Sequence, residues 1–421
     1  MSYIDKLKSK GISGLYDLVI GSVISAGIPI LTIPIISRIF DPGTYGQYAI
    51  YLNCIMLMSP LCSFQSEHII FTFRAKRTVK FFTGIVMYFV PVISIFVFFA
   101  FCLLALYTSI IDVPSNLLTP ILMYLSLLSL VFYAITAAYL TYTQDYAEVK
   151  LLEVRRALLV YLIPIGAYFL EENPSENYLL LGFFIGNSYA MVVFCKKYGV
   201  GEFLVLGRQF KFRRFLKVVR NRVVLTLYSM TSNLLNFISQ YAQVVLVGIS
   251  YGPLAAGIFT MGHRLVMMPV SFLSPPIYRF FISLLGDPGQ RSRVESVFVM
   301  LLFSLFIVCA IVGSLFYYII IPYVHILLGE EWTQSSAIMY PILFVSVARL
   351  LSAPFSGVLV SEKKQKFELV INCGLALAIF WSVHVSNAVL DYAYNVAILQ
   401  SSVYAAALIY YIYLIKRVSH E

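Results

Sequence analysis

Arginine side chains inside long apolar stretches are the residues of this sequence best suited to chemistry. Arg264 and Arg349 lie within such stretches, and Arg38 lies close to the end of another. A guanidinium group offers five N–H donors in a fixed plane, so it binds phosphates and carboxylates through paired hydrogen bonds. Placing an arginine at the centre of a membrane costs roughly 2.5 to 3.5 kcal/mol, which a ligand or a neighbour must offset. The three arginines are therefore candidates for binding a multivalent anion such as a diphosphate.

Each arginine also has a purely structural interpretation. At 1.5 Å per residue, Arg264 should lie about 15 Å and Arg349 about 20 Å from the outer ends of their helices. There they could bond to backbone carbonyls or to Asn and Gln of a neighbouring helix and only hold helices together. Arg38 precedes Asp41 by three residues at an outer helix end, where snorkelling or pairing with that carboxylate is the simpler interpretation.

A stripe of hydroxyl and amide side chains runs along the apolar stretch 223–249. Its members recur every three or four residues, so they share one face of a helix. Lipid does not accept such a face, which favours a water-filled cavity, with hydrogen bonding between helices as the alternative. Stretches 336–360 and 254–282 carry similar stripes that include Arg349 and Arg264. The candidates for lining the cavity are Asn233, Asn236, Gln240, Gln243 and Ser346.

Two carboxylates, Asp17 and Glu67, lie inside apolar stretches of the first half, near the inner ends of adjacent helices. A carboxylate there can exchange a proton or hold a cation, so both are candidates for coupling to H⁺ or Na⁺. Structural uses are the alternative, with Asp17 at a helix entrance and Glu67 paired with Arg74 or Arg77. Neither carboxylate is well placed to neutralise the arginines of the second half.

The composition excludes a soluble globular protein. Of the 421 residues, 60% are hydrophobic and 12% are charged, against about 25% charged residues in soluble domains. A helix needs roughly 20 apolar residues to cross a bilayer, and the chain has about twelve such stretches. We therefore predict an all-α integral membrane protein. The expected stretches are 15–37, 45–72, 80–106, 117–140, 154–171, 177–195, 223–249, 254–282, 296–322, 336–360, 367–388 and 392–415.

The basic residues indicate which loops face the cytoplasm. All of the 30 Lys and Arg residues except Arg38, Arg264 and Arg349 fall in alternate gaps, counted with the edges of the stretches that border them. Positive flanks stay on the cytoplasmic side, so both termini are expected there. Gap 141–157 counts as cytoplasmic, and the interrupted stretch 154–171 is kept because removing it would invert every later loop. The net charge of +10 is spread among these flanks, which argues against nucleic-acid binding.

A repeated turn indicates how the chain is divided. Shifted by 211 residues, 40–48 aligns with 251–259, and a proline, a glycine and an aromatic residue coincide. Each segment is expected between the first and second helix of its half. This predicts two pseudo-symmetric six-helix bundles, 1–195 and 223–421, around a central cavity, with 196–222 as a basic cytoplasmic linker. Transporters of this design bind substrate between the repeats and alternate access by rocking one bundle against the other.

No catalytic or metal-binding arrangement is visible in the sequence. The five His residues are scattered, and the six Cys residues lie in or beside apolar stretches without the spacing of metal ligands. An enzyme would want an extended loop or soluble domain for its chemistry, and the longest outer gap, about 323–335, is too short. We expect no enzyme activity, no cofactor and no metal.

Residues 36–48, ISRIFDPGTYGQY, resemble Wzx-type polysaccharide flippases, which belong to the multidrug/oligosaccharidyl-lipid/polysaccharide exporter (MOP) superfamily. The turn that ends at residues 257–259, the following Arg264, and residues 327–332, LLGEEW, look similar too. Together with the twelve-helix layout, the resemblance covers essentially the full chain.

The resemblance implies flipping of undecaprenyl-diphosphate-linked oligosaccharide repeat units from the cytoplasmic to the outer leaflet of a bacterial inner membrane, for O-antigen (lipopolysaccharide) or capsule assembly. The diphosphate would bind at Arg264 and Arg349, with Arg38 as a third candidate, while the lipid tail stays in the bilayer. Coupling to H⁺ or Na⁺ and contact with other polysaccharide assembly proteins are further implications. An exporter of drugs is the first alternative, although cationic drugs need carboxylates in the cavity. A membrane enzyme of polysaccharide assembly is the second.

Overall fold

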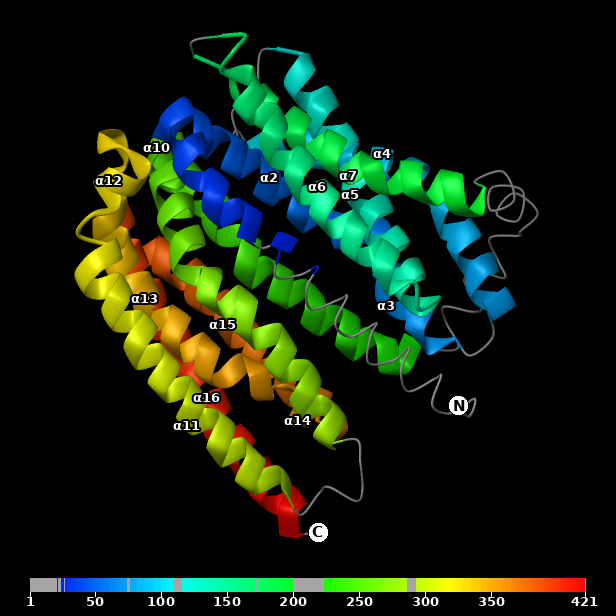
Figure 1. Cartoon of the computed structure of the whole chain (residues 1–421), viewed down its shortest axis with the longest axis vertical. Helices are drawn as coiled ribbons and strands as arrows, with labels where there is room; N and C mark the ends of the chain where they lie inside the picture. Colours follow the sequence, from blue (N-terminus) through cyan, green and yellow to red (C-terminus); the bar gives the residue numbers. More distant parts are fainter. Residues whose placement is uncertain are drawn as a thin grey trace. The chain divides into compact units, whose positions relative to one another are not determined.

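The computed structural model describes residues 21, 24–25, 27–73, 76–108, 116–171, 173–199, 223–285, 293–362 and 364–420. Throughout these residues the regular structure is helical, without β-strands, so the predicted fold class is confirmed (Figure 1). In the part of the chain that the structure describes, eight helices are long and apolar enough to cross a membrane, and one of them, Thr231–Ile282, covers two expected stretches. The chain is a multi-pass membrane protein.

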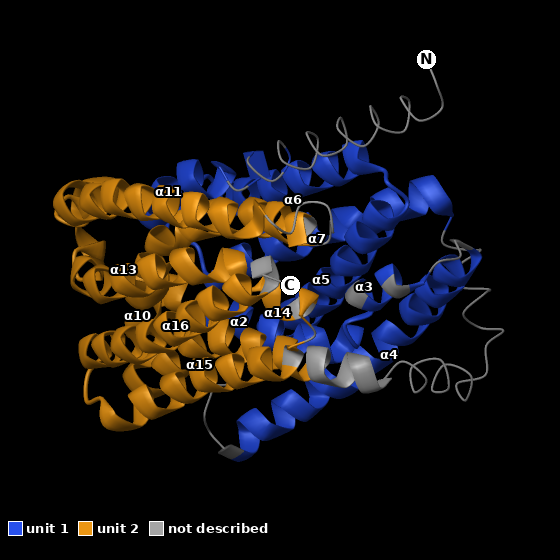
Figure 2. Cartoon of the chain, turned by 90° about the horizontal axis from the view of Figure 1, so that it is seen from below, with its two compact units in different colours: residues 1–40, 50–223 blue, residues 41–49, 224–421 orange. Residues whose placement is uncertain are grey.

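By its internal contacts the chain forms two compact units, which Figure 2 draws in blue and orange. Unit 1 comprises residues 1–40 and 50–223, and unit 2 comprises residues 41–49 and 224–421. The break near residue 223 lies beside the expected linker, most of which is outside the described residues. The nine residues 41–49 group with unit 2, although they come from the first half of the sequence. The boundaries of two six-helix bundles stay a prediction.

Unit 1 is built mainly from long helices. Gly27–Ile39 is an apolar helix, and the following helix α2 starts in unit 2 and continues in unit 1. The elements are α2 (Pro42–Ser63), α3 (Ser66–Ile69), η1 (Ile70–Thr72), α4 (Lys76–Thr108), α5 (Leu118–Tyr142), α6 (Tyr146–Ala167) and α7 (Glu176–Tyr198).

Helices α5, α6 and α7 pack against one another in unit 1. Small residues let α7 approach α6 closely: a Cβ on Gly182 would lie 2.7 Å from the carbonyl oxygen of Val160, and one on Gly186 would lie 2.5 Å from its Cγ2. Two glycines four residues apart form a groove that accepts the neighbouring backbone, as is common between membrane helices. The close contact fixes α6 over its central turns.

Unit 2 begins with a long helix that one residue interrupts. In α10 (Val223–Leu285), Gly252 has φ 88° and ψ 169°, outside helical values. Gly252 lies between the two expected stretches, 223–249 and 254–282. The predicted turn between them is therefore confirmed. The other elements are α11 (Val294–Leu315), the π-helical turn η3 (Phe316–Ile320), α12 (Val324–Leu328), η4 (Glu330–Trp332), α13 (Ser335–Ser352), η5 (Ala353–Phe355), α14 (Gly357–Ser361), α15 (Gln365–Val385) and α16 (Val389–His420).

Aromatic residues form part of the core of unit 2. Phe298 of α11 packs edge-on against Phe355 of η5, with ring centroids 4.6 Å apart, and Phe281 of α10 packs edge-on against Phe355 at 5.1 Å. Such edge-to-face pairs add about 0.5 to 1.5 kcal/mol beyond the apolar area that they bury. Helices α13 and α15 both pack along α16.

Three expected stretches differ from the helices. Stretch 45–72 was expected as one helix, but α2 ends at Ser63 because Phe64 and Gln65 have left-handed backbones, with φ 48° and 50°. Stretch 336–360 changes to a 3-10 turn at Ala353–Phe355, where Pro354 lacks the N–H that an α-helix needs.

The third difference concerns the stretch 154–171. Helix α6 already begins at Tyr146, so the basic residues of gap 141–157 lie on a helix and not in a loop. The hydropathy pattern placed the start of this helix too late. Five charged residues in the first half of α6 lower its hydropathy, although the helix is continuous.

Candidate functional site

Arg264 is fixed by a tyrosine from the first half of the sequence. Its Nη1 donates a hydrogen bond of 2.8 Å to the hydroxyl oxygen of Tyr45, and both residues belong to unit 2. Tyr45 is buried and meets the ring of Trp332 edge-on, with centroids 5.7 Å apart. A phenol is a neutral acceptor, so this bond orients the guanidinium without cancelling its charge. Arg264 is half-buried.

The backbone contact beside Tyr45 explains its position. A Cβ on Gly46 would lie 1.8 Å from the carbonyl oxygen of Pro253, and a Cβ on Gly257 would lie 1.9 Å from that of Pro42. These are the proline and glycine pairs that the 211-residue shift aligns, so the two repeated turns pack reciprocally on each other. Sequence reasoning missed Tyr45 as the partner of Arg264, although the Pro and Gly coincidence was the signal for it.

Asp41 starts the helix that carries Tyr45. Its carboxylate accepts hydrogen bonds from the backbone N–H of Gly43 at 2.8 Å and of Thr44 at 3.0 Å, and from the Thr44 hydroxyl. Partial burial raises the pKa of Asp41, but the hydrogen bonds from Thr44 and Gly43 outweigh it and hold the pKa below its ordinary value. Asp41 is thus an N-cap of α2.

Arg349 lies on α13, half-buried, three residues after Ser346. Ser346 is buried and donates to the carbonyl oxygen of Val266 at 3.1 Å, which ties α13 to the turn of α10 that carries Arg264. Next to Arg264, His263 stacks on Phe259 with 5.8 Å between ring centroids. Unit 2 therefore gathers two arginines and a histidine on two helices that are bonded to each other.

The polar stripe of α10 divides into two groups. Ser232 and Gln243 are buried: Ser232 accepts a 2.8 Å hydrogen bond from Asn372 of α15, and Gln243 donates to the carbonyl oxygen of Ser239 at 2.7 Å. The half-buried group consists of Asn233, Asn236 and Gln240, and the Gln240 amide donates to the Asn236 side chain at 2.9 Å. Interhelical bonding accounts for Ser232 and Ser346, which leaves the half-buried amides as the cavity-lining candidates.

The candidate residues that the structure describes in unit 1, Arg38 and Glu67, lie on different helices. Arg38 is exposed near the end of the helix Gly27–Ile39. Glu67 lies on α3, where its Oε1 accepts a 3.4 Å hydrogen bond from Ser63 and its Oε2 is buried without a hydrogen-bond partner among the described residues. The described part of the chain shows no ion pair between Glu67 and Arg77. Asp17 and Arg74 lie outside the described residues.

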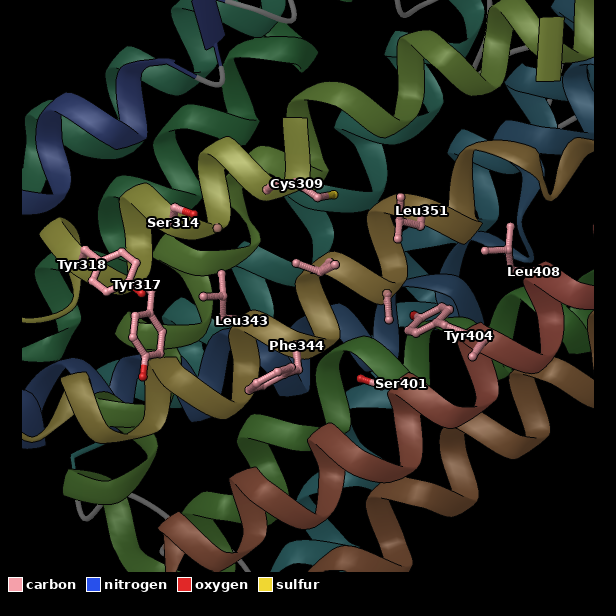
Figure 3. Close-up of a pocket in the computed structure, with 15 residues that line it drawn as sticks. Cys309, Ser314, Tyr317, Tyr318, Leu343, Phe344, Leu351, Ser401, Tyr404 and Leu408 are labelled. Carbon is pink, nitrogen blue, oxygen red and sulfur yellow. The ribbon is translucent and has the colours of Figure 1, made fainter. Parts of the chain in front are cut away.

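An apolar pocket of about 680 Å³ lies in unit 2, between α11, α13 and α16 (Figure 3). Small residues on all three helices open it, including Gly313, Ala348 and Ala405. The predicted binding residues do not line it. Its lining suits a hydrocarbon chain rather than a charged group. Sequence reasoning missed this pocket, whose signal was the small residues within apolar helices.

The sequence matches a family model described as polysaccharide biosynthesis protein over residues 14–281. No curated protein matches the chain in sequence.

Two solved structures share the fold. A multidrug resistance MATE family transporter of the MOP superfamily, in an inward-facing conformation, aligns with a TM-score of 0.60 and 15% identity over 96% of this chain and 95% of that one. The lipid II flippase MurJ, in an inward closed conformation, aligns with a TM-score of 0.65 and 10% identity over 98% and 90%. At 15% and 10% identity this likeness shows the fold, and the family model over residues 14–281 confirms the expected polysaccharide family.

Proposed function

Because the chain belongs to the polysaccharide biosynthesis protein family, we propose that it is a lipid-linked oligosaccharide flippase. It moves undecaprenyl-diphosphate-linked repeat units of O-antigen or capsule from the cytoplasmic to the outer leaflet of a bacterial inner membrane. Both termini lie in the cytoplasm, and the partners are the bilayer, the lipid-linked substrate and other polysaccharide assembly proteins.

The observation that carries this proposal is the arginine pair of unit 2. Arg264 is oriented by a neutral phenol at 2.8 Å, and Arg349 lies on the helix that Ser346 ties to the same region. An arginine held within a membrane helix marks a substrate path by default, and two of them favour an anion of high charge. A diphosphate matches this charge, and its oxygens accept the paired N–H donors of guanidinium groups.

Alternating access supplies the movement. Arg264 and Arg349 bind the diphosphate when the cavity opens inward and release it after the cavity opens outward, with Arg38 as a further contact. The half-buried amides Asn233, Asn236 and Gln240 offer hydrogen bonds to the sugars. In this mechanism the protein lowers the cost of moving a charged headgroup through hydrocarbon, and no covalent bond changes.

We further propose that Glu67 couples transport to a H⁺ or Na⁺ gradient, with Asp17 as the second candidate. The buried Oε2 of Glu67, without a hydrogen-bond partner among the described residues, offers a place for a proton or a cation. The same observation favours the second candidate function, an ion-coupled exporter of cationic drugs.

Loss of the gene tests the flippase directly. Deletion should leave complete lipid-linked repeat units at the cytoplasmic leaflet, which a membrane-impermeant sugar oxidant cannot reach in intact spheroplasts. Complementation with the wild-type gene should restore oxidation from outside. Complete units that already face outward in the deletion strain would contradict the flippase, and unchanged glycan with a new drug sensitivity would favour the exporter.

A further inference from the structure

Two adjacent arginines lie on the central part of α6. The hydropathy pattern assigns them to a cytoplasmic gap, but Arg155 and Arg156 follow the first residue of the helix, Tyr146, by nine and ten positions. Their neighbours are Tyr133 of α5 and Tyr189 of α7, each nine residues before the end of an apolar membrane-spanning helix. At 1.5 Å per residue the two tyrosines lie about 14 Å from the C-terminal ends of those helices, and the arginines lie beside them.

Both guanidinium groups rest on aromatic rings instead of carboxylates. The Cζ of Arg156 is 4.1 Å from the ring centroid of Tyr133. The Cζ of Arg155 is 5.7 Å from the ring centroid of Tyr189, and its Nη1 donates to the Tyr189 hydroxyl. A cation–π contact holds a cation in place and leaves its charge uncancelled. Each arginine therefore keeps its charge and most of its N–H donors.

Two nearby carboxylates pair with a lysine of α7. Lys197 of α7 contacts Asp145 and also lies 3.7 Å from Glu148, so these two carboxylates serve the lysine. Over the described ranges, neither Arg155 nor Arg156 forms an ion pair. The Nε of Arg156 is buried and has no hydrogen-bond partner among those residues. A buried donor without an acceptor is costly, the more so on a charged group, unless a ligand or water supplies one.

The helix is held rigidly at this point. A Cβ on Gly186 of α7 would lie 3.0 Å from the carbonyl oxygen of Arg156, so the two backbones are in direct contact. A snorkelling arginine would extend freely toward the inner surface. Arg156 instead lies across a ring of the neighbouring helix with its Nε enclosed, which is the geometry of a preorganised site.

We propose that Arg155 and Arg156 form a second anion site, in unit 1, which binds a phosphate group carried by a lipid. The site is separate from Arg264 and Arg349 and rests on the proposed flippase function for its substrate, the lipid-linked diphosphate. The headgroup of an anionic phospholipid carries the same chemistry and is the second source. Paired N–H donors from two adjacent guanidinium groups fit phosphate oxygens.

Binding of geranylgeranyl diphosphate to the full-length protein in phosphatidylcholine nanodiscs tests the site. The double variant Arg155→Gln/Arg156→Gln should bind about 10- to 100-fold more weakly at this site, which corresponds to the loss of one or two charge-assisted hydrogen bonds. Binding at Arg264 and Arg349 should stay, so the variant should retain one of the two diphosphate sites of the wild type. Replacing exposed Lys196 of the same unit, as Lys196→Gln, removes one positive charge and should leave the Kd unchanged. Tyr133→Leu should weaken binding, whereas Tyr133→Phe should not, since it retains the ring.

Further measurements distinguish the two possible sources of the phosphate group. They also distinguish a failure of the second site from a failure of the proposed flippase function. If inorganic pyrophosphate competes with geranylgeranyl diphosphate and phosphatidylglycerol in the disc does not, the ligand of the site is the diphosphate. Competition by phosphatidylglycerol instead supports the same site with a phospholipid as its source. Equal binding by wild type and the double variant, with unchanged unfolding temperatures, overturns the second site alone. A wild-type protein that binds neither prenyl diphosphate nor phosphatidylglycerol overturns the second site and counts against the flippase as well.

Discussion

Gly46 and Gly257 pack on each other through their backbones, each occupying a space in which a Cβ would lie within 2 Å of a carbonyl oxygen of the opposite turn. The two glycines are 211 positions apart and align in the internal repeat. Both belong to unit 2. Their contact brings Tyr45 to Arg264, so a repeated turn with no chemistry of its own positions the principal candidate for substrate binding.

Gly46→Ala and Gly257→Ala should destabilise the protein by roughly 1 to 3 kcal/mol or more, because a backbone oxygen cannot move aside as a flexible side chain can. Thermal unfolding in detergent measures the effect. Gly313→Ala is the matched control, since a Cβ there meets nothing within 4 Å and alanine favours the helix by about 0.5 to 1 kcal/mol. Equal unfolding temperatures for Gly46→Ala and wild type would refute the close contact.

Tyr45→Phe should remove the acceptor of Arg264 and keep the packing against Trp332. We expect a small loss of stability, about 0.5 to 1.5 kcal/mol, together with reduced glycan export. Quantitative blotting of surface glycan, normalised to protein level, checks the second effect. Tyr48→Phe, which changes a neighbouring tyrosine of the same helix, is the control, and a similar loss in both variants would argue against a special role for Tyr45.

Arg264→Glu and Arg349→Glu should abolish surface glycan at normal protein levels, because a carboxylate repels the diphosphate. Arg264→Lys and Arg349→Lys should retain part of the export, since they keep the charge and lose only the paired donors. Surface glycan in a complemented deletion strain is the measurement. Normal export by both Glu variants would show that unit 2 does not bind the headgroup through these residues.

Glu67→Gln should uncouple transport from the ion gradient. The amide keeps the size of the side chain and can still accept the bond from Ser63, but it takes up no proton and has no negative charge to attract a cation. In proteoliposomes, translocation by the wild type should rise several-fold with an imposed H⁺ or Na⁺ gradient, whereas Glu67→Gln should not respond. Glu176→Gln, at the first residue of α7, serves as the control. A gradient response that survives in Glu67→Gln would assign the coupling elsewhere.

Asp41 should make the stability of the turn at the start of α2 depend on pH. Because the pKa of folded Asp41 is lowered below the ordinary 3.8, its contribution is complete above that value and is lost as pH falls through the lower folded-state pKa. Asp41→Asn retains a good N-cap without the charge, and Asp41→Ala should cost about 0.5 to 2 kcal/mol. Unfolding temperatures between pH 2 and 6 should fall in acid more steeply for wild type than for Asp41→Asn; parallel curves would contradict this.

The sequence by itself determined the all-helical membrane fold, the helix break at Gly252 and the arginine candidates of unit 2. These follow from local properties. Hydropathy over about 20 residues selects a spanning helix, and a glycine allows the backbone conformation that ends one. The family resemblance also rests on short local segments. Each of these signals is contained in a continuous stretch of chain.

Only the tertiary structure decided which groups meet. Tyr45 contacts Arg264 across 219 positions, Ser346 bonds to α10, and Arg155 and Arg156 belong to the central turns of α6 on the rings of α5 and α7. The charges of α6 mislead a hydropathy pattern because it scores each segment against lipid, whereas neighbouring helices supply the actual surroundings. Partner choice depends on how closely backbones approach, and that distance is set by glycines from both turns acting together, which no single stretch of sequence contains.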